Sequence, residues 1–176
     1  LPQVRMDVRP TRLNDQMALL LARYRVDHTG VPVPWTSASA PVTAVWTEGT
    51  GMPTPGSEAV ESTSVEVDAV VEAVLEHATS TPDRSLAVVA LNAQHAERIR
   101  AQLTRTIGAE PGLASFFDPA RVEPFVVVDP DGARGLGRDH VIISVGFAKT
   151  PHGRVIHHFG VFSSPAGAGA MADVLR

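Results

Sequence analysis

The stretch Leu86-Ala87-Val88-Val89-Ala90-Leu91-Asn92 decides the predicted fold. An unbroken apolar run is typical of a strand that is buried on both faces of a sheet, because a half-exposed strand alternates apolar and polar side chains. Asn92 follows directly and is a preferred residue for capping the start of a helix. The helix that follows would turn these residues inward: Ala96, Ile99, Leu103 and Ile107. A buried strand that leads into an amphipathic helix indicates an α/β fold with a parallel sheet.

The same alternation of strands and helices continues on both sides of this stretch. Upstream, Thr63-Ser64-Val65-Glu66 has the T-x-x-E form of a capping box, in which Thr and Glu would satisfy each other's backbone N–H groups. The helix that it opens would bury one apolar face: Val67, Val70, Val71, Val74, Leu75 and Ala78. Further apolar runs predict strands at 42–46, 124–128 and 140–145. A helix over 13–24 and a hairpin or edge strand over 155–162 are also expected. We therefore predict an α/β domain with a mainly parallel sheet.

Length and composition limit the class of protein. The 176 residues, 44% of them hydrophobic, predict a single domain over 1–176 with one core. Residues 48–62 are rich in Gly, Pro, Ser, Thr and Glu, so we expect a flexible surface loop there. No run approaches the roughly 18 apolar residues of a membrane span. Because Leu1 stands in place of an initiator methionine, we expect a fragment of a longer protein.

Charge and cysteine content narrow the chemistry further. The absence of cysteine excludes disulfides, thiolate metal sites and cysteine nucleophiles, and it suits the cytoplasm. The net charge of −4, from 15 basic and 19 acidic residues, argues against a free-standing nucleic-acid grip based on overall charge. A local basic groove remains open as an alternative.

A glycine-rich segment, Asp129 to Asp139, lies between two predicted buried strands. Ligands of open α/β sheets bind at the carboxyl ends of strands, so a glycine-rich turn after Val128 is well placed for a binding site. Taken alone, the segment is more typical of a structural turn. It does not match a dinucleotide fingerprint, because a strand follows it rather than a helix, and it lacks the closing Glu of a calcium loop.

Other chemical motifs are missing or weak. His152, His157 and His158 do not favour a metal site, because adjacent residues of a strand point to opposite faces. No serine lies in a G-x-S-x-G elbow, and no G-x-x-x-x-G-K-[ST] phosphate loop occurs. We therefore assign no metal ligand and no catalytic residue, and we expect no ATP hydrolysis by this chain alone.

Several segments together resemble superfamily 1 helicases. Residues 85–95 read S-L-A-V-V-A-L-N-A-Q-H, similar to the family's S-L-G-V-V-T-F-N-A-Q-Q. Residues 125–146 are similar to the motif V region, with Asp131, Gly135 and Asp139 at the positions of its E-x-x-Q-G-x-x-x-D pattern. Residues 150–160 resemble the D-P-H-G-R-V…F-G stretch of large bacterial, in particular actinobacterial, helicase-like proteins. The segment from Val4 to Tyr24 sits where the family has Q-Y-R-M-x-P and a helix.

This resemblance implies the C-terminal RecA-like domain of a two-domain helicase. ATP and Mg²⁺ would be the cofactors, held with an upstream RecA-like domain that carries the phosphate loop. That upstream domain and single-stranded DNA or RNA would be the partners, and no membrane is implied. The resemblance places these residues in the nucleotide and nucleic-acid cleft: Arg5, Asn92, Gln94, Asp131, Arg134 and Gly135.

Departures from the family pattern leave a second hypothesis open. Arg134 replaces the motif V glutamine, and Leu136 replaces an acidic residue. Residues 167–176 lack the arginine-containing G-G-E-R-R-L-N-V-A-x-T-R pattern, whose arginine reaches the γ-phosphate in the family. The domain is therefore either part of an active motor or a catalytically degenerate interaction module of a larger protein. A free-standing α/β binding protein is a third alternative.

Overall fold

The computed structural model describes residues 3–7, 42–45, 47, 50–51, 60–148 and 150–152. Its centre is a five-stranded sheet in the order β2-β1-β6-β4-β5, and every neighbouring pair in it is parallel. The prediction of an α/β fold with a parallel sheet is thereby confirmed. The strands are β1 (Gln3–Asp7), β2 (Val42–Val45), β4 (Leu86–Ala90), β5 (Val126–Val128) and β6 (His140–Ser144).

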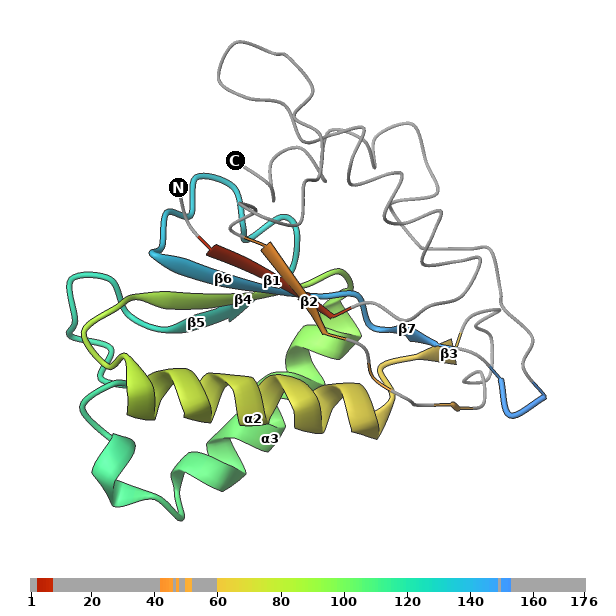
Figure 1. Cartoon of the computed structure of the whole chain (residues 1–176), viewed down its shortest axis with the longest axis horizontal. Coiled ribbons are helices and arrows are strands. Elements are labelled where there is room, and N and C mark those ends of the chain that lie inside the picture. The colour runs from red at the N-terminus through yellow and green to blue at the C-terminus, as the bar shows by residue number, and fades with distance from the viewer. Residues whose placement is uncertain are drawn as a thin grey trace, which may run out of the picture.

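Two helices, α2 (Ser64–Ser80) and α3 (Ala93–Ile107), lie on the same face of this sheet (Figure 1). A short 3-10 helix, η1 (Pro111–Leu113), follows α3. The core between helices and sheet contains the inward faces expected from the sequence, with Val70, Val74 and Ile99 at most 1% exposed. In β4, Val88 faces this core, whereas Val89 is buried outside it. Both faces of β4 are thus covered, as its apolar run predicts.

A second, two-stranded sheet pairs β3 (Val60–Glu61) with β7 (Phe147–Ala148) in antiparallel fashion. β3 falls inside the range 48–62 that the sequence predicts as a loop, and Ser62 directly after it is 1% exposed. A short pairing of this kind cannot be read from two residues of sequence, because it depends on a partner more than 80 residues away. It places the start of α2 beside the end of β6 (Figure 1).

The two helix starts differ in how they are capped. At α3 the prediction is confirmed, because the Asn92 side chain accepts a hydrogen bond from the His95 backbone N–H at 2.7 Å. At α2 the predicted capping box is wrong. Thr63 is the N-cap residue but makes no side-chain cap hydrogen bond, and the Glu66 carboxylate accepts from Ser144 and Gly146 instead. A buried position in the fold has overridden the local capping preference of this glutamate.

At the amino ends of β4 and β6, Ser85 and Asp139 bind each other reciprocally. Asp139 Oδ2 accepts from the Ser85 backbone N–H at 3.0 Å, and Ser85 Oγ accepts from the Asp139 backbone N–H at 2.9 Å. Arg84 adds an ion pair with Asp139 at 3.4 Å. We call this group the amino-edge clamp. It aligns the entries of two neighbouring strands.

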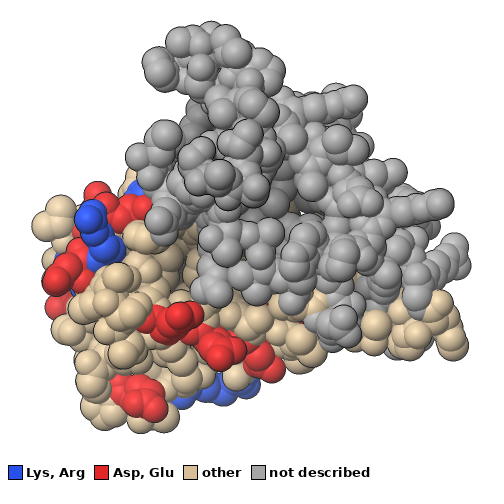
Figure 2. Space-filling model, viewed as in Figure 1, with Lys and Arg blue, Asp and Glu red and all other residues tan. Residues whose placement is uncertain are grey.

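The outer face of α2 is acidic. Asp68, Glu72 and Glu76 follow one another at one-turn spacing and line a shallow hollow of about 560 Å³, together with Val71 and Leu75. Figure 2 shows acidic side chains in a row across this helix. Because phosphates are repelled by such a face, it does not suit nucleic acid.

Some predictions lie outside the described residues, namely the helix over 13–24 and the hairpin over 155–162 with His157 and His158. No helix in the described part of the chain is long and apolar enough to cross a membrane.

Candidate functional site

The candidate site lies where β4 and β6 end, at the carboxyl edge of the sheet. Ala90 and Ser144 are opposite each other in the register of these two parallel strands. The first turns of α2 and α3 arrive at the same edge (Figure 1). Carboxyl ends of parallel strands and helix N-termini together form the usual ligand-binding place of an open α/β sheet. Four side chains meet beneath this edge.

These four residues, Ser62, Glu66, His95 and Ser144, form what we call the polar cluster. They come from the segment before α2, from α2, from α3 and from β6, and none is more than 5% exposed. Ser62 Oγ lies 2.8 Å from His95 Nδ1, and Ser144 Oγ lies 2.7 Å from His95 Nε2. The Ser144 hydroxyl donates to Glu66 Oε1 at 2.7 Å, and Glu66 Oε1 lies 3.5 Å from His95 Nε2.

Gly146 connects the backbone to this cluster. Its N–H donates to Glu66 Oε1 at 2.8 Å, and its carbonyl accepts from the Ser62 N–H at 2.8 Å and from Asn92 Nδ2 at 3.4 Å. Its φ of +71° lies in the region that favours glycine. A Cβ there would approach Asn92 and His95 to 2.8 Å. Both the conformation and the close approach therefore require glycine at this position.

The Glu66 carboxyl is held in its ionised form. Burial by itself raises its pKa, since a charge is costly in a nonpolar interior. The neighbouring His95 ring, the Gly146 backbone N–H and the Ser144 hydroxyl outweigh that effect, so the pKa lies below its ordinary value of 4.5. The carboxylate is therefore a buried anion whose hydrogen-bond partners are part of the fold.

The polar cluster contains serine, histidine and glutamate, but its geometry is not that of a nucleophilic triad. In a triad the carboxylate orients the histidine from the ring nitrogen that faces away from the nucleophile. Opposite Ser144, that position is occupied by Ser62. Opposite Ser62, it is occupied by Ser144, and Glu66 Oε1 lies farther from the ring nitrogen, at 3.5 Å, and binds the Ser144 hydroxyl. His95 and Ser144 are 0% exposed, so a substrate cannot reach them. Burial of this kind does not favour covalent catalysis at these side chains.

Of the residues predicted from sequence, Asn92 and Gln94 lie at this edge. Asn92 joins the start of α3 to Gly146 through the two hydrogen bonds of its side-chain amide. Gln94 is exposed in the first turn of α3. Arg5 lies in β1, opposite Ile142 of β6 and two residues before Asp7, where β1 ends.

The turn after β5 holds the other predicted residues. Asp131 and Arg134 form an ion pair at 3.5 Å, with 88% and 63% of their side chains exposed. The turn is stabilised from within, because Asp129 Oδ1 accepts from the Gly132 N–H at 3.0 Å. Gly135, at a φ of +71°, has no atom within 4 Å of a Cβ built on it. The turn starts beside β4 and returns to the amino ends of the strands. Two of the predicted residues, Asp131 and Arg134, contact each other in this turn. Asn92 instead contacts His95 at the start of α3.

The described residues contain no group of three or more His, Cys, Asp or Glu side chains that could hold a metal ion. His152 is exposed. The sequence reasoning missed Ser62, Glu66, His95 and Ser144 as a group. A signal was present, since Glu66 precedes the buried Val70 by one helical turn and His95 precedes Ile99 in the same way. Polar residues on a predicted inward face require buried partners.

Comparison with known proteins leaves the family of the chain undetermined. No protein-family model matches it, and neither a curated protein nor a solved structure matches it significantly. The functional argument therefore depends on the residues themselves.

Proposed function

We propose that this chain is a RecA-like domain, the C-terminal half of a superfamily 1 helicase or nucleic-acid-dependent ATPase of the cytoplasm. Its role is to close on an upstream domain when ATP and Mg²⁺ bind there, and so to move single-stranded DNA or RNA. The observation that carries the proposal is the carboxyl edge of the sheet. Two adjacent parallel strands end beside the first turn of α3, and the polar cluster fixes that turn from below.

The charge distribution supports this location for the ligand. The outer face of α2 carries three acidic residues, which disfavours phosphate there. The first turn of α3 contains no acidic residue and includes the exposed Gln94, and the backbone N–H groups and dipole of a helix start favour an anion. In this proposal Asn92 and Gln94 face the cleft, and Arg134 contributes a cation from the turn after β5.

A second candidate function is a catalytically degenerate interaction module. The ion pair between Arg134 and Asp131 favours it, because it partly neutralises the cation that the cleft would need. The substitution of the motif V glutamine by Arg134 agrees with this alternative.

The test is fluorescence anisotropy of a labelled single-stranded oligonucleotide titrated with the chain at several salt concentrations. The motor proposal expects binding that weakens steeply with salt, because phosphate contacts release counterions. Gln94→Ala and Arg134→Ala should each lower the affinity several-fold. Arg105→Ala is the matched control, because Arg105 is an exposed arginine near the far end of α3. Flat anisotropy, or equal losses for Arg134→Ala and Arg105→Ala, would favour the interaction module.

A further inference from the structure

Counting hydrogens fixes the direction of the bonds inside the polar cluster. A serine hydroxyl has one hydrogen to donate, and an ionised carboxylate only accepts. The Ser144 hydrogen goes to Glu66 Oε1, 2.7 Å away. Ser144 Oγ must therefore accept at its second short contact, the one with His95 Nε2 at 2.7 Å. It follows that Nε2 of the His95 ring carries a hydrogen.

The other ring nitrogen extends the same chain. Where the ring carries this one hydrogen and no second, Nδ1 is an acceptor. Ser62 Oγ lies 2.8 Å from His95 Nδ1, so the Ser62 hydroxyl is the donor there. Hydrogen bonds thus run in one direction from Ser62 through His95 and Ser144 to Glu66. We call this chain the relay. Its members are at most 5% exposed, so water does not compete for these contacts.

The relay connects segments that are far apart in the sequence. Ser62 precedes α2, Glu66 belongs to α2, His95 to α3 and Ser144 to β6. Gly146 closes the arrangement into a ring, since its N–H binds Glu66 and its carbonyl binds the Ser62 N–H. Ser62 itself has a φ of 55°, unusual for a residue other than glycine. A strained backbone of this kind persists only where the surroundings hold it in place.

We propose that the relay is the positioning device of the carboxyl edge. It fixes the Nε2–H tautomer of His95 and thereby holds the first turn of α3, with Asn92 and Gln94, against the segment after β6. The link from this geometry to ligand affinity rests on the proposed function. An apolar cluster of equal volume could fill the same space, but it would not specify one relative orientation of the four segments.

The first test is the ¹⁵N NMR spectrum of the histidine rings of the 176-residue chain at pH 8. His95 is assigned by the signals that disappear in His95→Gln. The expected result is a protonated Nε2 and a bare Nδ1. The opposite tautomer, a mixture of the two, or a ring with hydrogens on both nitrogens would overturn the relay. Ser62→Ala should shift the backbone amides of Asn92 and Gly146, and unchanged amide signals in this variant would also overturn it.

The second test measures oligonucleotide affinity for matched variants. Ser62→Ala should weaken binding roughly five- to tenfold, a typical size for coupling through a packed network. His95→Gln, whose amide nitrogen can donate in place of Nε2, should bind within about twofold of the wild type, whereas His95→Leu should lose affinity. Circular dichroism checks that each variant is folded. Should His95→Leu fail to fold, Ser62→Ala and His95→Gln carry the comparison.

The two proposals fail in different ways. A wild-type chain that does not bind the oligonucleotide contradicts the proposed function, and the relay is then decided by the ring tautomer and the amide shifts alone. A wild-type chain that binds, together with a Ser62→Ala variant of equal affinity, overturns the positioning role and leaves the proposed function standing.

Discussion

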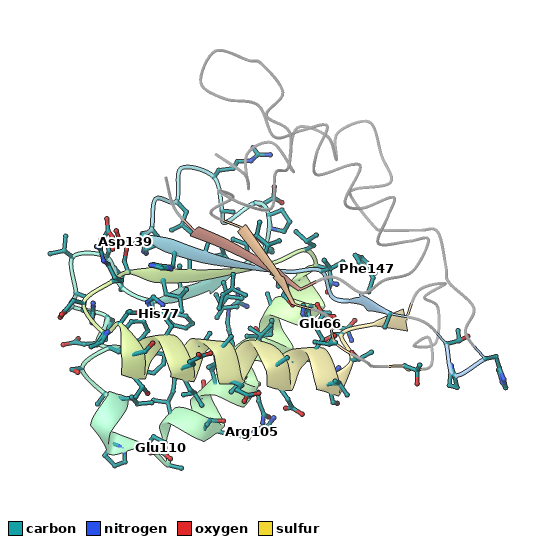
Figure 3. All side chains as sticks on the ribbon, in the orientation of Figure 1. Glu66, His77, Arg105, Glu110, Asp139 and Phe147 are labelled. Carbon is teal, nitrogen blue, oxygen red and sulfur yellow. The ribbon has the colours of Figure 1, made fainter. Side chains whose placement is uncertain are left out.

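The two edges of the sheet use the same kinds of residue in opposite surroundings. The amino-edge clamp contains a serine, an aspartate and an arginine, and the side chains of Arg84 and Asp139 are 64% and 40% exposed. The polar cluster contains serines, a glutamate and a histidine, and its Glu66 and His95 side chains are 6% and 0% exposed. Figure 3 shows Asp139 and His77 at one end of the strands and Glu66 and Phe147 at the other.

Exposure decides what each group of residues contributes. The Ser85 backbone N–H is the largest influence that keeps the pKa of Asp139 below its ordinary value, with help from Arg84. Water screens such exposed charges, so the loss of one partner in the clamp should change the free energy of unfolding only a little. In the polar cluster a lost partner leaves a buried polar group unsatisfied, which is costly. Of these two edges, the carboxyl edge is therefore expected to tolerate less change.

The largest expected effect comes from Gly146→Ala. The new Cβ would lie 2.8 Å from atoms of Asn92 and His95 at a φ of +71°, so we expect a loss of about 3 kcal/mol or more in the free energy of unfolding. Urea denaturation measures it.

Two further glycines separate the causes of that loss. Gly135→Ala has the same φ of +71° but open space, and should lose only about 1 kcal/mol. Gly137→Ala has neither constraint and should change stability by less than about 0.5 kcal/mol. Similar losses for Gly146→Ala and Gly135→Ala would show that close approach to the polar cluster is unimportant.

The next effect compares a serine from each edge. Ser144→Ala removes the hydroxyl between His95 and Glu66 and should destabilise the chain by about 2 kcal/mol, because both partners stay buried. Ser85→Ala should cost clearly less, because Asp139 keeps its bond to the Ser85 backbone N–H and remains open to water. Chemical denaturation of both variants tests the ranking, and a reversed order would contradict it.

Acid sensitivity should differ between Glu66 and an exposed glutamate. Because the folded pKa of Glu66 lies below 4.5, its charged form stabilises the fold above that pH, and this contribution is lost as pH falls through the folded pKa. Glu66→Gln should therefore be less stable than the wild type at pH 7. The difference in the free energy of unfolding between the two proteins should become smaller toward pH 4. Urea midpoints at pH 7, 5 and 4 measure this. Glu72→Gln, altered on the exposed face of α2, is the control and should show no such narrowing.

The smallest effect concerns His140 at the amino edge. Burial, followed by the charge of His77 at a ring distance of 4.9 Å, holds the pKa of His140 below its ordinary value of 6.5, although Asp139 opposes this. Protonation then favours the unfolded chain, so stability should decline as pH falls below about 6.5. His140→Gln should reduce this decline slightly, as thermal melts between pH 7.5 and 5.5 would detect. The exposed His152→Gln serves as control, and an equal change in both variants would refute the assignment to His140.

The sequence predicts the parts of the fold that depend on local pattern. Apolar runs locate β4 and β6 to within a residue, and Asn92 caps α3 as its side chain and position suggest. The capping box at Thr63 fails, because Glu66 has a partner about 80 residues away that no local rule reveals. The same holds for β3, whose pairing with β7 is equally distant. Whether the edge binds nucleotide or nucleic acid stays a prediction.

The position of β6 in the sheet also bears on how the chain folds. It comes after β1, β2, β4 and β5 in the sequence, yet it lies between β1 and β4 and is hydrogen-bonded to both. The pair of β1 and β2 and the pair of β4 and β5 therefore cannot join into one sheet until residues 140–144 are available. During synthesis, the edges of the earlier strands that β6 will pair with stay unpaired until β6 is made. Long-range pairing of this kind is intrinsically slow. A chain that ends before His140 would leave two separate half-sheets, each prone to pair with a neighbouring molecule.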